Sequence, residues 1–275
     1  MRIGSDMSGV NNARMQQNTQ KAQEKAMQKL SSGNKINKAS DDAAGLSISE
    51  KMIRQIQGLN KAIDNSSDGM AMTNVADGAM DEVGGMLERL NELAIQGSNG
   101  TLSADDRSAI NAEANQLLSD INRVSGSTTF NEMHVMENGN ADIQSGTDNT
   151  SSNRVTVSMQ NMDANTLGIG GIDLSTANGS RAALTPISDA IKALSDQRSN
   201  LGAQYNRMSA TSRNLGNVVE NTTSANSRVR DTDMGQEASK LRKNQLLLKA
   251  QQQTAQKNRE DRAAQAGTLQ NIQLH

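Results

Sequence analysis

A stripe of apolar residues at helical spacing runs from Thr185 to Val229. Steps of four and three residues alternate along it, and nine of its thirteen positions are apolar or tyrosine. This 3.5-residue repeat is the period of helices that pack along one another in coiled coils. Thr185 can cap such a helix, and Pro186 suits its first turn. The helix would be roughly 65 Å long, so the stripe predicts a bundle of long helices.

Six apolar positions of this stripe are expected to form the seam on which the chain assembles: Ile187, Ile191, Leu194, Leu201, Leu215 and Val219. Four polar positions interrupt it: Arg198, Ser212, Thr222 and Asn226. Single polar residues at seam positions set the register of coiled coils. We therefore expect these four residues to fix how the helices align.

Composition leaves few other folds open. The 275 residues include one Phe, one Tyr, one Pro and no Trp, and only 34% are hydrophobic. A large globular core needs bulky apolar side chains, whereas narrow seams between helices do not. The scarcity of proline agrees with long unbroken helices.

Two further helices of the same period are expected at residues 46–96 and 103–125. Between them lies the turn sequence GSNG (97–100), and Ser103 followed by Asp106 resembles a capping box. Residues 1–30 predict a polar helix with too little apolar surface to fold alone.

Residues 126–184 are rich in Gly, Asn, Ser and Thr. Val155, Val157 and Met159 alternate with polar residues, which is typical of a strand. Ile143 and the segment 169–174 could supply other strands. We expect a small β-hairpin region at about 130–180.

Neither catalysis nor cofactor binding is indicated. The chain has no Cys, and its two histidines, His134 and His275, lie in no metalloprotease motif. The acidic pairs at 41–42 and 231–233 are expected to cap helices and to pair with Arg228 and Arg230. The sequence thus predicts no enzyme activity, no cofactor and no metal site.

The distribution of charge and hydropathy argues against nucleic acid and membranes as partners. Residues 1–45 carry a net +3 and residues 236–275 a net +4, which leaves −9 for the middle. These basic ends lack the aromatic residues that stack on nucleic acid, so we expect no nucleic-acid partner. We also expect no membrane span and no cleaved signal peptide, because the chain has no long apolar run and no apolar N-terminal segment.

Several long motifs resemble one family. The N-terminal half contains LSSG followed by IN, then ASDDAAGL, SISEKM, QIQGLNKA (55–62) and LERLNELAIQGSNGTL (87–102). The C-terminal half contains LGAQYNRM (201–208) and SRVRDTDM (227–234). These motifs are similar to the terminal signatures of bacterial flagellins, and the resemblance covers roughly residues 29–134 and 184–245.

The resemblance implies a mainly α-helical chain with only the two inner flagellin domains. Residues 46–234 would form a coiled-coil helical rod that carries the β-hairpin region. Residues 1–45 and 235–275 would be disordered in the monomer and pair as helices in the filament core. The chain would be secreted without a cleaved signal peptide and polymerise with itself into the extracellular filament that drives motility. Its other partners would be the flagellar export apparatus, an export chaperone and the filament cap.

The resemblance also points to recognition by the Toll-like receptor that senses flagellin. The family's receptor-binding positions correspond to Arg89, Leu93 and Glu113. An alternative stays open, in which Leu93 lies in the seam and the two charged residues form a solvated pair.

Two other kinds of protein would have similar terminal helices. One is a hook–filament junction protein, which would not polymerise alone. The other is a flagellin-like receptor ligand that does not assemble. The length of the matching signatures favours flagellin over both.

Overall fold

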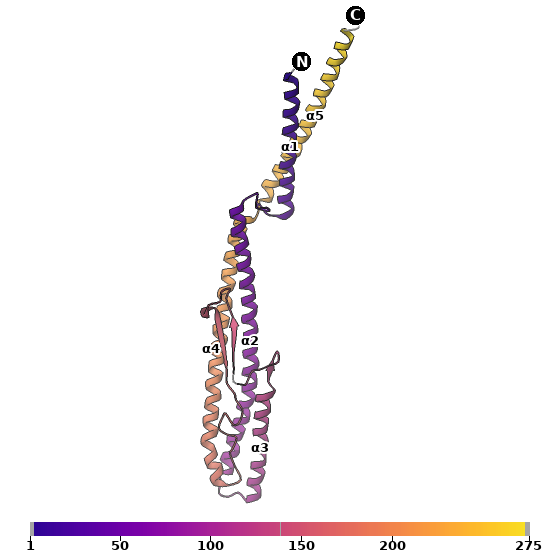
Figure 1. The fold of residues 1–275 in the computed structure, drawn as a ribbon. Helices are drawn as coiled ribbons and strands as arrows, with labels where there is room; N and C mark the ends of the chain where they lie inside the picture. Colours follow the sequence, from indigo (N-terminus) through magenta and orange to yellow (C-terminus); the bar gives the residue numbers. More distant parts are fainter. Residues whose placement is uncertain (1–2, 138, 273–275) are drawn as a thin grey trace. The chain divides into compact units, whose positions relative to one another are not determined.

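The computed structural model describes residues 3–137 and 139–272, and His275 lies outside them. The regular elements of these residues are five long helices, one short 3-10 helix (Ser151–Asn153) and two small antiparallel strand pairs (Figure 1). The helices are α1 (Ile3–Ser32), α2 (Ala43–Gly97), α3 (Ala104–Ser127), α4 (Ala177–Arg230) and α5 (Met234–Ile272). The strands are β1 (Thr129–Phe130), β2 (Met133–His134), β3 (Gly139–Gln144) and β4 (Arg154–Met159). This mainly α-helical fold with a β-hairpin agrees with the fold class expected from the sequence.

Side chains that accept hydrogen bonds from the first turn start three of the helices. Asp42 Oδ1 accepts from Gly45 N at 2.9 Å at α2, and Asp233 Oδ1 accepts from Gln236 N at 3.0 Å at α5. Ser103 and Asp106 form the expected capping box at α3. These caps satisfy backbone donors that have no partner inside the helix.

Helix α4 begins nine residues before Pro186, the first helical position expected from the sequence. Thr176 caps it, since its hydroxyl accepts from Gly179 N at 3.0 Å. Pro186, expected in the first turn, instead lies inside the helix. Its missing N–H leaves the carbonyl of Ala182 without its usual donor, and Ala182 is exposed to water. The proline was therefore a misleading start signal.

The chain divides into two compact units. The first comprises residues 1–54 and 222–275, and the second comprises residues 55–221. The dividing points lie further inside α2 and α4 than the boundaries expected at 45/46 and 234/235. Both helices therefore contribute to both units.

The second unit has an extensive apolar core between α2, α3, α4 and the hairpin. Its largest fully buried side chains are Met72, Met80, Leu87, Leu90, Leu93, Ile121, Met136, Met162, Ile169, Leu174, Ile187 and Leu201. A smaller cluster joins Leu59 and Ala62 of α2 to Leu215 of α4. Each fully buried leucine or isoleucine contributes roughly 1.5–3 kcal/mol, so this core is the main source of stability in the unit.

Strands β3 and β4 form the expected hairpin, with Ile143 opposite Val155. Val155, Val157 and Met159 are buried, as their alternation predicts. The close approach of β3 to α2 depends on Gly69, because a Cβ there would lie 2.9 Å from Cγ1 of Ile143.

The expectation of another strand at 169–174 is wrong. This segment is irregular with a turn at residues 170–171, and the turn before it ends at Gly168, which has a φ of +73°. Ile169 and Leu174 are nevertheless fully buried. Their apolar character reflects core packing from a loop, which a short apolar run cannot distinguish from a strand.

In the first unit, α1 and α5 run alongside each other (Figure 1). The loops that join α1 to α2 and α4 to α5 are held together by the backbone. Lys35 N donates to Arg230 O at 2.6 Å, and Thr232 N donates to Gly33 O at 2.9 Å. Gly33 has a φ of +70°, which favours glycine at this position. We refer to these two hydrogen bonds as the loop clasp.

Candidate assembly and recognition surfaces

The pair formed by α1 and α5 buries very little. Among the side chains that the structure describes on these two helices, only Ala26 and Glu237 are buried. The exposed large apolar side chains on the pair are Met7, Val10, Met15, Met27, Met234, Leu246 and Leu247. These side chains are accessible to contact with other chains.

Among the contacts between described residues, few polar ones join α1 to α5. Gln251 Nε2 donates to Thr19 Oγ1 at 3.1 Å. The side-chain oxygen of Gln251 is buried and has no hydrogen-bond partner among the described residues. A buried acceptor without a donor costs free energy, so this contact adds little to the stability of the helix pair.

A basic groove lies between the two helices near the loop clasp. Lys25 and Lys29 of α1 and Lys240 and Lys243 of α5 line it. Glu237, on the same groove, pairs with Lys240 at 2.8 Å. One carboxylate thus faces four ammonium groups, which gives this part of the pair a net positive charge.

An ion cluster on the second unit joins α2 to α4. Arg198 Nε lies 2.8 Å from Asp77 Oδ1, and its Nη1 lies 2.8 Å from Asp81 Oδ1. The hydrogen bond with Asp77 is the main cause that raises the pKa of Arg198. The arginine interrupts the apolar stripe because it pairs with two carboxylates one helical turn apart.

The other polar stripe positions differ in what they contact. Asn226 Oδ1 accepts from the buried Ser49 hydroxyl at 2.7 Å, which links α4 to α2 within the first unit. Ser212 and Thr222 are partly exposed. Their expected role in register stays a prediction.

The six seam residues pack within the chain itself. Ile187, Leu194, Leu201 and Leu215 are buried, while Ile191 and Val219 are partly buried against the two clusters. Their proposed role in assembly between chains stays a prediction.

Arg89 and Glu113, expected from the family's receptor site, lie together on the second unit. Arg89 Nη2 is 2.7 Å from Glu113 Oε1, and Arg89 Nη1 is 2.9 Å from Glu92 Oε2. The hydrogen bond with Glu92, followed by that with Glu113, raises the pKa of Arg89. Leu93 is only 1% exposed and belongs to the core. The two charged residues are thus accessible to a partner, whereas Leu93 is not.

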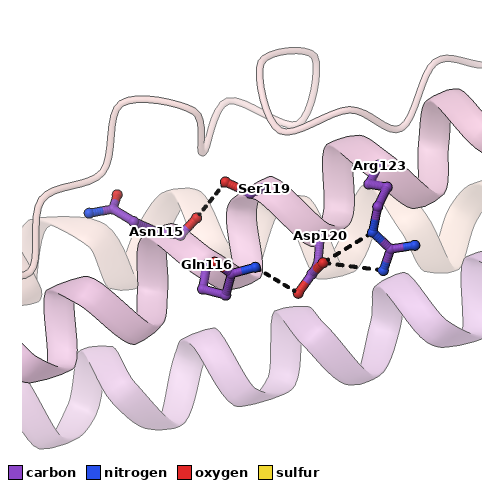
Figure 2. A network of polar contacts seen from close by, with 5 residues as sticks. All are labelled: Asn115, Gln116, Ser119, Asp120 and Arg123. Carbon is purple, nitrogen blue, oxygen red and sulfur yellow. Dashed lines mark hydrogen bonds and ion pairs between the residues drawn. The ribbon is translucent and has the colours of Figure 1, made fainter.

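The outward face of α3 beyond Glu113 is polar. Asp120 accepts from Arg123 Nε and Nη2, both at 3.2 Å, and from Gln116 Nε2 at 3.5 Å. Ser119 donates to the carbonyl of Asn115 at 3.0 Å (Figure 2). These contacts stay within one helix, so they stabilise α3 without fastening it to another element.

The expected ion pairs of the acidic residues are absent from the described part of the chain. Arg228 and Arg230 pair with no carboxylate there; Asp233 caps α5 instead, and Asp231 accepts from the Ser227 hydroxyl. Asp41 accepts from Asn37 N and Lys38 N, and the bond from Asn37 chiefly lowers its pKa. Asp42 and Asp233 therefore act as helix caps, whereas Asp41 and Asp231 accept hydrogen bonds from other nearby groups.

The described residues form no recognisable catalytic or metal-binding site. His134 is exposed at the end of β2. No group of three or more His, Cys, Asp or Glu side chains in the described ranges could hold a metal ion. Within the same ranges, no helix is long and apolar enough to cross a membrane.

Some structural residues were missed from the sequence. Gln197 is buried and donates to Ser158 O at 2.8 Å, which fastens α4 to β4. Glu237 is also buried. A polar residue beside a stripe resembles a surface residue, so only knowledge of the partner element could have identified either one.

Two family models match the chain. The bacterial flagellin N-terminal helical region matches residues 3–141, and the bacterial flagellin C-terminal helical region matches residues 184–263. The matches together include α1, α2 and α3 and most of α4 and α5, so they reach both the terminal pair and the core of the second unit.

Known proteins from several bacteria are similar over nearly the whole chain. A flagellin of Halalkalibacterium halodurans is 39% identical over 243 residues, which cover 87% of this chain and 89% of that protein. The flagellar filament 31.3 kDa core protein of Treponema maltophilum is 35% identical over 266 residues, which cover 91% and 93%. A flagellin of Bacillus subtilis is 36% identical over 287 residues, which cover 92% and 94%.

Solved structures share the arrangement of helices. The crystal structure of Bacillus cereus flagellin has a TM-score of 0.51 and 25% identity, and covers 55% of this chain and 88% of that chain. The structure of a putative flagellar hook-associated protein from Vibrio parahaemolyticus has a TM-score of 0.60 and covers 70% of this chain and 100% of that chain. At 13% identity, the second likeness concerns the fold alone.

Proposed function

The chain belongs to the bacterial flagellin family, and we infer from this that it is a structural subunit of the bacterial flagellar filament. The observation that carries this function is the match of both terminal helical regions in one chain. The exposed apolar side chains of α1 and α5 supply a surface for self-association. A hook–filament junction protein and a ligand that does not assemble are not favoured, since the relatives that match most of the chain are flagellins and filament core proteins.

Electron microscopy of the purified protein at high salt tests this function. We expect long filaments that grow from added seeds. Absence of filaments over a wide range of protein and salt concentrations would contradict the assignment. A variant that lacks residues 1–32, and therefore α1, is the matched control and should remain monomeric.

Under this proposal, the terminal pair of helices, α1 and α5, becomes fully ordered only in the filament. The near absence of buried side chains on α1 and α5 supports it, because so little burial does not offset the entropy of ordering two long helices. Hydrogen exchange should be fast at both helices in the monomer and slow in the filament. Equal protection in the two states would rule out ordering on assembly.

Positive charge on the terminal pair should make assembly depend on salt. The four lysines of the basic groove face only one carboxylate, and counterions screen repulsion between such groups on neighbouring chains. The rate of seeded growth should therefore rise between about 0.01 and 0.15 M salt. The variant with Lys25 and Lys243 replaced by Gln should depend less on salt.

We propose from the family likeness that the chain leaves the cell through the flagellar export apparatus without a cleaved signal peptide. An export chaperone would hold the monomer, and a filament cap would guide its addition. Mass spectrometry of the N-terminus in assembled filaments is the test. An intact N-terminal region is expected, and removal of roughly the first 15–30 residues would contradict it.

Recognition by a flagellin-sensing Toll-like receptor is a further proposal on the family likeness. The exposed pair of Arg89 and Glu113 supports it. Arg89→Ala should weaken receptor activation by the monomer, whereas Arg123→Ala, on the outward face of α3, should not. Leu93→Ala is a poor test because Leu93 is buried and its loss destabilises the core. Unchanged activation by folded Arg89→Ala would exclude this site.

A further inference from the structure

Methionines are distributed unevenly between exposed and buried positions. Among the methionines whose side chains the structure describes, the exposed ones are Met7, Met15, Met27, Met133 and Met234, with exposed fractions between 48% and 64%. The most deeply buried ones are Met80, Met136 and Met208, each 0% exposed. The same chain therefore contains thioethers that water and small oxidants reach freely, and thioethers that only unfolding would expose.

Three of the exposed methionines lie on α1. Among the described side chains, the exposed large apolar residues of this helix are Met7, Val10, Met15 and Met27. Three of the four exposed large apolar side chains described on α1 thus contain a thioether. On α5, by contrast, Leu246 and Leu247 are exposed, and neither is oxidised by peroxides.

The rest of the composition leaves methionine as the main target of mild oxidants. The chain has no Cys and no Trp. A thioether sulfur is soft and polarisable, and its oxidation converts an apolar side chain into a polar one.

We propose that Met7, Met15 and Met27 are a modification site through which peroxides control self-association. A lone pair of the thioether sulfur attacks one peroxide oxygen, so that an S–O bond forms and the O–O bond breaks. The sulfur loses two electrons and becomes a sulfoxide, and hydrogen peroxide is reduced to water. Reduction by a methionine sulfoxide reductase reverses the change.

The consequence for assembly follows from the polarity of the sulfoxide. Burying this group at a contact between chains costs free energy unless a donor meets it. Oxidised α1 therefore associates poorly, while the core of the second unit is unaffected because its methionines are inaccessible. This inference rests on the proposed function, since it concerns the association of α1 in the filament.

The first experiment measures where oxidation occurs. The full-length monomer is treated with hydrogen peroxide, and peptide mass spectrometry follows sulfoxide formation at each methionine. Oxidation at the three α1 positions should be about tenfold or more faster than at Met80, Met136 and Met208, which react only on opening of the core. In the filament the α1 positions should react more slowly than in the monomer. Equal rates at exposed and buried positions, or no protection in the filament, would overturn the proposal.

The second experiment measures seeded filament growth before and after peroxide treatment. Growth of the oxidised wild type should fall roughly tenfold and should return after treatment with a reductase. The variant M7L/M15L/M27L should grow at the same rate with and without treatment. Leucine and methionine have similar size and helix propensity, so this variant keeps the helix.

Met133→Leu is the matched control, because Met133 is 48% exposed but lies on β2. Its growth should remain sensitive to peroxide. If the triple variant is inhibited as strongly as the wild type, or if oxidised wild type grows normally, the inference fails. If untreated wild type forms no filaments, the proposed function fails, and the claim about assembly fails with it.

Discussion

The terminal helix pair and the second unit differ in how their residues are used. In the second unit, α2, α3 and α4 bury long rows of Leu, Ile and Met around the hairpin. In the terminal pair, α1 and α5 are as regular as those helices, yet they leave their large apolar side chains exposed. Helical periodicity alone therefore does not indicate a stable fold, because the stability of a helix in a protein comes mainly from the surface it buries.

The largest difference between the two regions is expected when one leucine in each is replaced by alanine. Leu90→Ala removes a fully buried side chain of α2 and should lower the free energy of unfolding by about 2–5 kcal/mol. Leu246→Ala on α5 should change it by less than about 0.5 kcal/mol, because Leu246 is exposed. Chemical denaturation followed by circular dichroism measures both. A similar loss in the two variants would remove the distinction between the regions.

The same pair of variants separates stability from assembly. Leu246→Ala should slow seeded growth although it leaves the monomer unchanged. Normal growth of this variant would show that its side chain is not part of the contact between chains.

A smaller effect is expected at the start of α3. Ser103→Ala removes the hydroxyl that accepts from Asp106 N at 3.1 Å, and should cost about 1 kcal/mol. Thermal unfolding of the second unit measures the loss. Ser31→Ala, on an exposed position near the end of α1, should leave that transition in place and is the control.

Asp163 should make the stability of the second unit depend on pH. Its carboxylate accepts from Thr166 N at 2.6 Å and from Asn161 Nδ2 at 3.1 Å, and the bond from Thr166 is the main cause that lowers its pKa below the usual 3.8. The carboxylate therefore stabilises the unit at pH values above 3.8. That contribution is lost as the pH falls through the lower pKa of the folded state.

Asp163→Asn should accordingly reduce the acid sensitivity of unfolding between neutral pH and pH values below 3.8. Urea denaturation at several pH values is the measurement. The control is Asp189→Asn at an exposed position of α4. An unaltered pH dependence in Asp163→Asn would mean that this carboxylate does not contribute.

The smallest effect is expected in the terminal region. Asn226→Leu removes the acceptor for the Ser49 hydroxyl, which can then donate to a carbonyl of its own helix. The free energy of unfolding should change by less than about 1 kcal/mol, while filament growth should lose regularity if Asn226 sets register. No change in stability or in filament form would exclude a role in register.

Much of the fold follows from local patterns in the sequence. The 3.5-residue repeat predicts the helices, alternation predicts β4, and Ser103 with Asp106 predicts the cap of α3. The missed features depend on partners far along the chain. Gln197 is buried only because β4 lies against it, and no local pattern marks Lys35 and Arg230 as hydrogen-bond partners.

The candidate surfaces could be predicted only in part. The family motifs alone predict that Arg89 and Glu113 belong to one site, because corresponding residues of similar chains occupy corresponding positions in the fold. The sequence leaves open whether Leu93 faces a receptor or lies in the seam, and the structure places it in the core, 1% exposed. Exposure depends on how neighbouring elements pack, which the family motifs alone do not specify.

The loop clasp has a consequence for the order in which the chain matures. Its donors and acceptors come from residues 33–35 and 230–232, and α1 runs along α5, the last helix to be synthesised. The N-terminal helix must therefore wait, without its partner, until almost the whole chain has been made. The loop clasp can form only after residues 230–232 have been made, and under the proposed function the helix pair beyond it orders fully only when the chain joins the filament.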